Sequence, residues 1–466
     1  MADTAVSHPH LSGLLSPVRS EDDFEMRVRG RIPDALNGAY YRNGPNPHFD
    51  PPGSYHAFIG DGMIHGFFLN STRDGGRSRY RNRWARTPRW QAEDKAGRAL
   101  FGGMGMPSDP SVAGVNPGGA NTNIVSHAGR LMALQEQSEP FEMDAATLES
   151  VGFMQTGGKF TAHPKKDPET GELIWFAYCA GAEPLNNLVD YGVTDASGKV
   201  TRRDRFAAPY CSMIHDFMVT QNYVLFPVLP LTGDLRRAMS GRPAMAWEPG
   251  KGSFVGVMKR NASIDSIRWF EMDPNYVFHP MNAYEDGSKI HCELMEYPSA
   301  PLFPDTEGSP GADAEARLTR WTIDLAQPSN SVKRERLDDL CSEFPRFDER
   351  RAGLPYRHGW YAANVGRRDS LAFNVFDTLA HIDLATGKRT VRTLGPGDSA
   401  GEPIFVPRTE DAPEGDGYVI ALVHRASEHR SDLLILNAQD IAGEPAAVLE
   451  LPRHVPAGFH GNWVAA

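Results

Sequence analysis

HIDLATGKRT, at His381–Thr390, runs from a short apolar segment through an aspartate into a turn of small residues. The same order occurs in FEMDAATLES at Asp144, in RWTIDLAQPS at Asp324 and in LLILNAQD at Asn437. Together with Asp383, these positions follow one another at intervals of 180, 59 and 54 residues. A unit of roughly 54–60 residues fits all three intervals if the first spans three units, and such a period is typical of radial repeats. Because strand, aspartate and turn are a common order, the repeat alone leaves other large β folds open.

Short apolar runs between turns fill most of the chain. Gly and Pro number 45 and 36 among 466 residues, above their usual combined share of about 12%, so we expect many turns. Runs rich in β-branched and aromatic residues predict strands at Leu173–Tyr178, Tyr223–Leu229, Phe254–Lys259 and Tyr418–Val423. Helices are predicted only at Trp90–Leu100 and Gly233–Met239. After an N-terminal arm over residues 1–35, residues 36–466 have room for about seven units of an all-β fold, within the usual range of propeller blades.

Charge and hydropathy exclude several classes of protein. The net charge is −11, with 48 Lys and Arg against 59 Asp and Glu, and no basic block offers a surface for nucleic acid. No stretch of about 18 apolar residues predicts a transmembrane helix, and the N-terminus lacks a signal-peptide pattern. Four cysteines without a CxxC pair predict reduced, mostly buried thiols in a cytoplasmic protein.

Four of the sixteen histidines recur at intervals close to the repeat. His163, His215, His279 and His460 each follow an apolar run, with gaps of 52, 64 and 181 residues. In a propeller the inner strands of all blades face one axis, so residues this far apart could converge there. Four imidazoles would suit iron, zinc or copper. Singly, each histidine is more often a hydrogen-bonded core or surface residue, and the spacing does not remove that alternative.

Three glutamates are candidates to support such a site. Glu136, Glu343 and Glu402 each lie beside an apolar strand or a proline-flanked turn. A metal-bound imidazole usually donates its second N–H to a carboxylate. Most glutamates are solvated, so each one alone would be interpreted as a surface residue.

Nine segments, in order, resemble the carotenoid cleavage oxygenase family over about Leu14 to Trp463. They are YYRNGPNP (Tyr40–Pro47), GDGMIHGF (Gly60–Phe67), ANTNIVSHAGRLMALQE (Ala120–Glu136), TAHPKKDPETGEL (Thr161–Leu173), IHDFMVT (Ile214–Thr220), FHPMNAYE (Phe278–Glu285), EFPRFDERRAG (Glu343–Gly353), GEPIFVPR (Gly401–Arg408) and FHGNWV (Phe459–Val464). The resemblance implies a single seven-bladed β-propeller over residues 36–466, with a dome of helices and loops over one face.

The resemblance also implies a chemistry. By motif, the family's four Fe(II)-binding histidines fall on His163, His215, His279 and His460, and its three supporting glutamates on Glu136, Glu343 and Glu402. The implied reaction is oxidative cleavage of a C=C bond by O2 to give two aldehydes or other carbonyl products. A tunnel would select the double bond by positioning it. A propeller scaffold that binds an apolar ligand without chemistry is the alternative from another class, and the intact histidines count against it.

The substrate class depends on two positions. Members of the family cleave carotenoids or apocarotenoids, stilbenoids, or phenylpropenes. This chain is similar to the bacterial lignostilbene group, in which a lysine before the first glutamate and an upstream tyrosine hold the phenol. Here those positions are Gln135 and Phe101, which recognise a phenolate less well than a cation does. We therefore expect a carotenoid or apocarotenoid, with a stilbenoid or phenylpropene such as lignostilbene, resveratrol or isoeugenol as the alternative.

Two further expectations concern the tunnel and its mouth. Phe58 and Phe303 are candidates to line the tunnel, since aromatic walls suit a conjugated chain; core packing is the alternative. The segment Phe226–Trp247 mixes apolar residues with arginines and could rest weakly on a membrane surface near the entrance. Its weak amphipathic pattern favours an ordinary surface loop instead.

Overall fold

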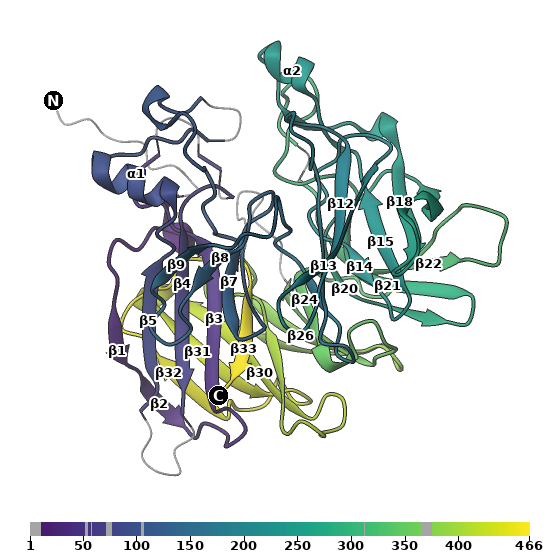
Figure 1. The fold of residues 1–466 in the computed structure, drawn as a ribbon. Coiled ribbons are helices and arrows are strands. Elements are labelled where there is room, and N and C mark those ends of the chain that lie inside the picture. The colour runs from purple at the N-terminus through teal and green to yellow at the C-terminus, as the bar shows by residue number, and fades with distance from the viewer. Residues whose placement is uncertain are drawn as a thin grey trace.

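Seven β-sheets of four to six strands make up the body of the molecule (Figure 1). The computed structural model describes residues 11–51, 55–56, 58–70, 77–103, 107–311, 313–365 and 375–466. Successive sheets follow one another along the chain as the blades of a propeller, so the predicted all-β, seven-bladed fold is confirmed.

Each blade is an antiparallel sheet formed mostly by consecutive strands. The first four blades contain β3 (Gly38–Pro45), β4 (Gly62–Leu69), β5 (Arg79–Trp84), β1 (Asp23–Glu25) and β33 (Gly461–Ala465); β6 (Asn123–His127), β7 (Arg130–Leu134), β8 (Phe141–Met143) and β9 (Ser150–Phe153); β10 (Lys165–Lys166), β11 (Leu173–Ala177), β12 (Leu188–Thr194) and β13 (Val200–Ala207); and β14 (Met218–Val219), β15 (Tyr223–Val228), β18 (Ser253–Lys259) and β19 (Arg268–Met272).

The last three blades are built in the same way. They contain β20 (Tyr276–Asp286), β21 (Lys289–Tyr297), β22 (Arg317–Asp324) and β23 (Lys333–Arg336); β24 (Cys341–Phe347), β25 (His358–Asn364), β26 (Thr378–Asp383) and β27 (Lys388–Thr393); and β28 (Ser399–Ala400), β29 (Ile404–Pro407), β30 (Gly417–Arg425), β31 (Arg430–Asn437), β32 (Ala447–Glu450) and β2 (Arg27–Gly30). The four predicted strands correspond to β11, β15, β18 and β30, each within two residues at either end.

Both ends of the chain close the ring. The C-terminal strand β33 pairs with β3 of the first blade, where Tyr40 lies opposite Trp463. The N-terminal strand β2 pairs with β32 of the last blade, where Val28 lies opposite Leu449. Residues more than 400 positions apart are thus joined by backbone hydrogen bonds, which ties the first and last blades together.

The sequence repeat marks the turn after the third strand of a blade. Asp144 directly follows β8, while Asp324, Asp383 and Asn437 end β22, β26 and β31. Each side-chain oxygen accepts a hydrogen bond from the backbone N–H two residues further on, at 3.0–3.1 Å. Asp195, after β12, makes the same bond with Ser197. Such Asx turns fix a hairpin locally, so the repeated residue is the one that turns the chain outward to the fourth strand.

Two short α-helices lie on one side of the ring, at the top of Figure 1. Helix α1 (Pro88–Ala96) begins after the capping residue Thr87 and ends at Gly97, whose φ is 67°. It begins two residues before its predicted start, because Pro88 suits the first helical position. Helix α2 (Leu235–Met239) begins after the cap Asp234 and follows a small hairpin strand.

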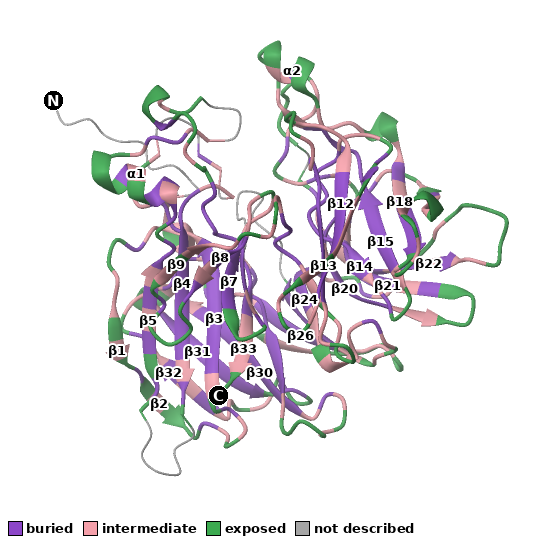
Figure 2. Ribbon diagram, in the orientation of Figure 1, coloured by how far each residue is buried: buried purple, intermediate pink, exposed green. Residues whose placement is uncertain are grey.

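Within the described residues, the remaining short elements are that hairpin and six 3-10 turns. They are β16 (Leu231–Gly233), β17 (Met245–Trp247), η2 (Gly13–Leu15), η4 (Pro110–Val112), η5 (Pro249–Lys251), η6 (Ile264–Ser266), η7 (Glu349–Arg351) and η8 (Ala426–Glu428). The strands are mostly buried, while exposed residues concentrate in the connecting loops (Figure 2). Among the residues that the structure describes, no helix is both long and apolar enough to cross a membrane.

Candidate metal centre

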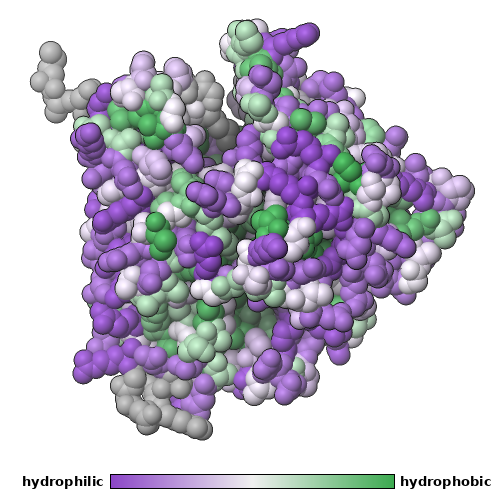
Figure 3. Space-filling view, in the orientation of Figure 1, coloured by the Kyte–Doolittle hydropathy of each residue, from purple (hydrophilic) through white to green (hydrophobic). Residues whose placement is uncertain are grey.

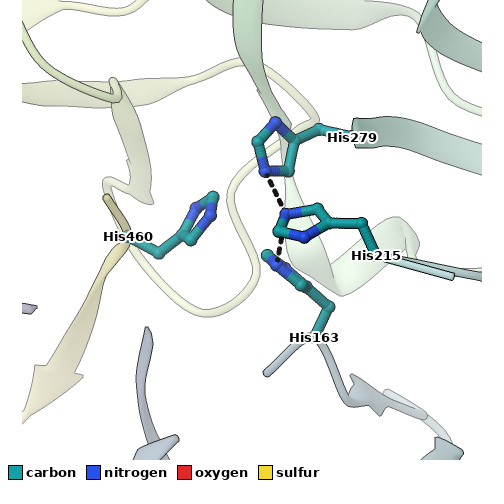
Figure 4. Close-up of side chains that lie close together, drawn as sticks. All are labelled: His163, His215, His279 and His460. Atoms are coloured by element: carbon teal, nitrogen blue, oxygen red, sulfur yellow. Dashed lines mark hydrogen bonds between the residues drawn. The ribbon is translucent and has the colours of Figure 1, made fainter. Parts of the chain in front are cut away.

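Four histidines from four blades meet inside the propeller (Figure 4). His163, His215 and His460 lie shortly before β10, β14 and β33, and His279 lies within β20. Each of these strands is the edge strand of its sheet. One ring nitrogen from each side chain lies within 4.8 Å of the others, and all four residues are buried.

The central contacts join Nε2 atoms. The Nε2 atom of His215 lies 3.1 Å from Nε2 of His163 and 3.1 Å from Nε2 of His279. The His460 ring completes the group, with its centroid 4.6 Å from that of His163 and 4.7 Å from that of His279. The imidazoles therefore converge from several directions on one small volume.

Three of the four imidazoles also contact a glutamate through Nδ1. His215 contacts Glu136, Nδ1 of His279 lies 2.5 Å from Glu343, and Nδ1 of His460 lies 3.0 Å from Glu402. A carboxylate accepts a hydrogen bond, so the proton of each neutral ring is on Nδ1. The Nε2 atom of each ring then carries a lone pair, and these lone pairs face one another.

This donor set fits a metal ion. Two lone pairs 3.1 Å apart cannot hydrogen-bond to each other. Nitrogen ligands about 2.1 Å from a metal ion would be about 3.0 Å apart at right angles and about 3.4 Å apart in a tetrahedron, and the Nε2 atoms here are 3.1 Å apart. Imidazole ligands suit first-row ions such as iron, copper, nickel and zinc.

Burial keeps two of the histidines neutral. It lowers the pKa of His163 well below its usual range, and the neighbouring histidines add to the effect. Burial also lowers the pKa of His460 to about 4, against the opposing charge of Glu402. For His279, burial lowers the pKa, but the charge of Glu343 and its hydrogen bond outweigh burial and raise it. Neutral imidazoles are the form that binds a metal.

The glutamates are themselves held in place. Glu343 accepts hydrogen bonds from the Tyr297 hydroxyl at 3.0 Å and from the Phe344 backbone N–H at 2.7 Å. The Tyr178 hydroxyl donates to Glu136. These tyrosines are not identified in the sequence analysis, because the pairs are 46 and 42 residues apart and depend on how the blades pack.

Glu402 is held by a charge as well as by hydrogen bonds. It accepts from the Gly461 N–H at 2.9 Å, and the Arg346 guanidinium lies 3.2 Å away. Burial raises the pKa of Glu402, but Arg346 and His460 outweigh burial and lower it to about 2. Arg346 also donates to the carbonyl of Gly461, the residue after His460, at 3.0 Å, so it fixes both the glutamate and the backbone beside the histidine.

His163 has a different partner. Its Nδ1 atom lies 3.8 Å from Asp216, which is beyond hydrogen-bond distance. Asp216 is buried and binds Lys165 Nζ at 2.7 Å. The fourth histidine therefore faces a buried ion pair rather than a directly bonded carboxylate, and nothing in the local sequence distinguishes Lys165 or Asp216 as members of such a pair.

Irregular backbone orients two of these side chains. Strand β20 has register shifts between Val277 and Pro280, on either side of His279, and such bulges redirect a side chain. Phe344, next to Glu343, has a φ of 52°, beside another irregularity in β24. A non-glycine residue with positive φ is strained, and such strain is usually kept where function needs the geometry.

Aromatic rings form a wall beside the histidines. The Phe278 ring lies edge-on to His215 at 5.1 Å, and the Phe58 ring lies 6.0, 6.2 and 5.6 Å from those of Phe278, Phe303 and Phe459. The structure thus brings Phe58 and Phe303 together near the centre. Phe278 and Phe459 are missed by the sequence analysis, although Phe-His occurs at both positions and could have indicated them.

The other two predicted lining residues lie in different surroundings. Phe101 is buried in a separate cluster with Leu100 and Val112, and the Arg89 guanidinium lies 5.1 Å from its ring. Gln135 is half-buried. Its Oε1 atom accepts hydrogen bonds from the backbone N–H groups of residues 119 and 120 at 2.5 and 3.1 Å. Phe101 is therefore not part of the aromatic wall, and its role toward a substrate stays a prediction.

Fold and site together define a class: a seven-bladed propeller with a cluster of four histidines that fits a metal ion. Residues 15–465 match the family described as retinal pigment epithelial membrane protein. The chain is 39% identical to an isoeugenol monooxygenase of Pseudomonas nitroreducens, over all of this chain and 99% of the relative. It is 33% identical to a carotenoid cleavage oxygenase of Mycobacterium tuberculosis, over 98% and 97% of the two chains.

A solved structure agrees with these relatives. The crystal structure of Pseudomonas brassicacearum lignostilbene dioxygenase superposes with a TM-score of 0.93 at 34% identity, covering 98% of each chain. The chain therefore belongs to the retinal pigment epithelial membrane protein family, which includes the carotenoid cleavage oxygenases, and the resemblance drawn from its motifs is confirmed.

Proposed function

We propose that this protein is a non-haem Fe(II) dioxygenase that cleaves a C=C bond of a conjugated alkene with O2, giving two carbonyl products. The observation that carries the proposal is the set of four buried imidazoles, three of them oriented by carboxylates. His163, His215, His279 and His460 would hold the iron. When bound, Fe(II) would activate O2, whose direct reaction with closed-shell alkenes is otherwise slow.

The protein's own groups act by orientation. Glu136, Glu343 and Glu402 keep the proton of their histidines on Nδ1, so that each Nε2 is free to bind the metal. The rings of Phe58, Phe278 and Phe459 offer a dry, apolar surface beside the centre. A double bond laid against this wall would be held at a fixed distance from the metal and shielded from water, which is how positioning accelerates a reaction.

Two substrate classes are supported by separate observations. An aryl alkene, such as a stilbenoid or a phenylpropene, is supported by the compact wall of phenylalanines and by the 39% identity to a relative named isoeugenol monooxygenase. A carotenoid or apocarotenoid is supported by Gln135 and Phe101, which supply no cation for a phenolate, and by the relative named carotenoid cleavage oxygenase. Both classes contain the conjugated C=C bond that the proposed reaction needs.

One experiment tests the function and separates the substrate classes. Iron-loaded protein is incubated with β-apo-8′-carotenal, a full-length carotene, resveratrol and isoeugenol in separate reactions, and products are identified by mass. Two carbonyl fragments whose masses add to the substrate plus both atoms of O2 support the proposal. If resveratrol is cleaved and neither polyene is cleaved, the interpretation that Gln135 and Phe101 favour a polyene is refuted. No cleavage of any alkene by fully loaded protein would refute the function.

The segment that carries α2 is the candidate surface for contact with a membrane. Leu235 and Met239 on this helix are 40% and 80% exposed, and Arg236 and Arg242 lie in the same segment. Figure 3 shows apolar surface at this tip of the molecule. We propose that the protein is cytoplasmic and that this tip makes weak contact with a membrane when an apolar substrate is taken up.

A further inference from the structure

Two cysteines from neighbouring blades lie side by side near the metal centre. Cys179 follows β11, and Cys211 lies between β13 and β14. Their Sγ atoms are 3.6 Å apart. Cys179 is 3% exposed, whereas Cys211 is half-buried. All four cysteines are in the described part of the chain, and none is bonded to another in a disulfide. The proposed reaction uses neither of these two thiols.

The pKa values of the two thiols are shifted in opposite directions. The hydrogen bond between the two thiols lowers the pKa of Cys179, against the effect of burial, and the positive charge of Lys159 lowers it further. Lys159 Nζ also donates to the Cys179 carbonyl at 2.5 Å. The same contact and burial raise the pKa of Cys211. A thiolate is the form of cysteine that reacts with oxidants, and the cation of Lys159 beside Cys179 makes Cys179 the nucleophile of the pair.

Both cysteines are joined to the group that orients His215. Tyr178, the residue before Cys179, donates a hydrogen bond from its hydroxyl to Glu136, and Glu136 contacts His215. Cys211 precedes His215 by four residues in the same irregular segment. A change in the distance between the two sulfurs therefore acts on both ends of the Tyr178–Glu136–His215 chain of hydrogen bonds.

The surroundings of Cys211 leave little room for a different pairing. The backbone N–H of Gly233 donates to the Cys211 carbonyl at 3.1 Å. A Cβ atom at Gly233 would lie 2.7 Å from the Cys211 sulfur, so glycine is what lets β16 approach this thiol. Cys292, by contrast, lies fully buried on β21, and burial raises its pKa well above the usual range.

We propose that Cys179 and Cys211 form a reversible disulfide under peroxide, and that this bond alters the metal centre through Glu136 and His215. The Cys179 thiolate attacks one oxygen of hydrogen peroxide and becomes a sulfenic acid, and the other oxygen leaves as water after protonation. The Cys211 thiol then displaces water from the sulfenic sulfur to form the S–S bond. In total, two thiols and one peroxide give one disulfide and two waters, with two electrons passing from sulfur to peroxide.

The chemical step is tested by peptide mapping of the full-length protein. Metal-free protein is treated with a small excess of hydrogen peroxide, alkylated and digested without reductant, and its peptides are identified by mass. We expect a linked pair containing Cys179 and Cys211 that dithiothreitol separates, while Cys292 stays alkylatable. In Cys211→Ser we expect Cys179 to be trapped as a sulfenic acid by dimedone. Cys179 and Cys211 remaining thiols, or oxidising without linkage, would overturn the proposal.

The effect on the metal centre rests on the proposed function and has its own readout. Oxidised and reduced proteins are freed of peroxide, loaded with Fe(II) and compared for iron bound per chain and for alkene cleavage. We expect oxidation to lower one or both at least threefold in the wild type and to have no effect in Cys179→Ser/Cys211→Ser. Equal iron binding and turnover before and after disulfide formation would overturn the regulatory part. If no alkene is cleaved at all, peptide mapping and iron binding still decide the proposal.

Discussion

The histidine centre and the loop part of the aromatic wall, Phe58 and Phe303, are held by different parts of the chain, whereas Phe278 and Phe459 directly precede two of the histidines. The histidines lie in or next to edge strands of four blades, and three of them contact carboxylates that are themselves hydrogen-bonded. Phe58 and Phe303 come from loops outside the strands and meet through ring contacts. Ring contacts have weak directional preference compared with hydrogen bonds. We infer that the fold fixes the chemistry of the centre, whereas the part of the wall that comes from loops can vary with the substrate.

Removal of one histidine should have the largest effect, because it takes a ligand away from the centre. We expect His279→Ala to lose stoichiometric iron and at least 100-fold in turnover, because both the lone pair and the proton donor to Glu343 disappear. Iron per chain is measured by mass spectrometry after loading and gel filtration. His291→Ala is the matched control, since His291 lies on the neighbouring strand β21 and contacts Thr322. Retained iron and turnover in His279→Ala would refute the assignment of His279 as a ligand.

A milder change tests whether the carboxylates are part of the fixed centre. We expect Glu343→Gln to weaken iron binding roughly 10–100-fold, the usual cost of losing such a partner, because a neutral amide holds the Nδ1 proton of His279 less strongly. The affinity is measured by competition with a chelator. Glu335→Gln, on the exposed outer strand β23, serves as control. An unchanged affinity would mean that Glu343 is not needed to orient His279.

Position 135, which precedes Glu136 and lies outside the aromatic wall, should affect specificity rather than metal binding. In Gln135→Lys we expect the preference for a 4-hydroxystilbene over its methyl ether to rise roughly tenfold, which corresponds to about 1.4 kcal/mol of added interaction with the phenolate. The ratio of kcat/KM values for the two substrates measures it, with Gln439→Lys on the outer part of the last blade as control. A fall in iron content would show instead that position 135 belongs to the centre.

The smallest effect is expected at the tip that carries α2. Replacing the exposed Met239 by glutamate should reduce co-sedimentation with anionic lipid vesicles about twofold, because one apolar contact is lost and a repelled charge is added. Turnover of a water-soluble alkene should not change. Gln439→Glu, at an exposed position shortly after β31, adds the same negative charge elsewhere and is the control. Equal sedimentation of wild type and Met239→Glu would argue against membrane contact at this tip.

The features that could be predicted from the sequence are those governed by local geometry or by the repeat. Asp324 and Asp383 recur because each one caps the turn after a third strand. His163, His215 and His279 recur because each one lies at the corresponding edge of its blade. Asp195 has the same turn but is not predicted from the sequence. The preceding strand LVDYGVT contains a glycine and an aspartate, so it does not form an apolar run.

Residues that depend on how blades and loops pack could not be found in this way. Tyr178, Tyr297 and Arg346 support the glutamates across blade boundaries, and nothing in their local sequence distinguishes them from core residues. The surroundings of Phe101 also depend on loop packing. The resemblance to the family predicts that this position faces the substrate, which stays a prediction, and the side chain packs in a small cluster under Arg89. Loop conformation, rather than a repeated strand pattern, decides such positions.

The most direct test of the central claim is alkene cleavage measured against the amount of iron bound. Metal-free protein is titrated with Fe(II) under nitrogen, exposed to O2 with the preferred alkene, and assayed for both carbonyl products. The account predicts that turnover rises in proportion to bound iron, reaches its maximum at one iron per chain, and disappears when a chelator removes the metal. Cleavage by iron-free protein, or none at one iron per chain, would contradict it.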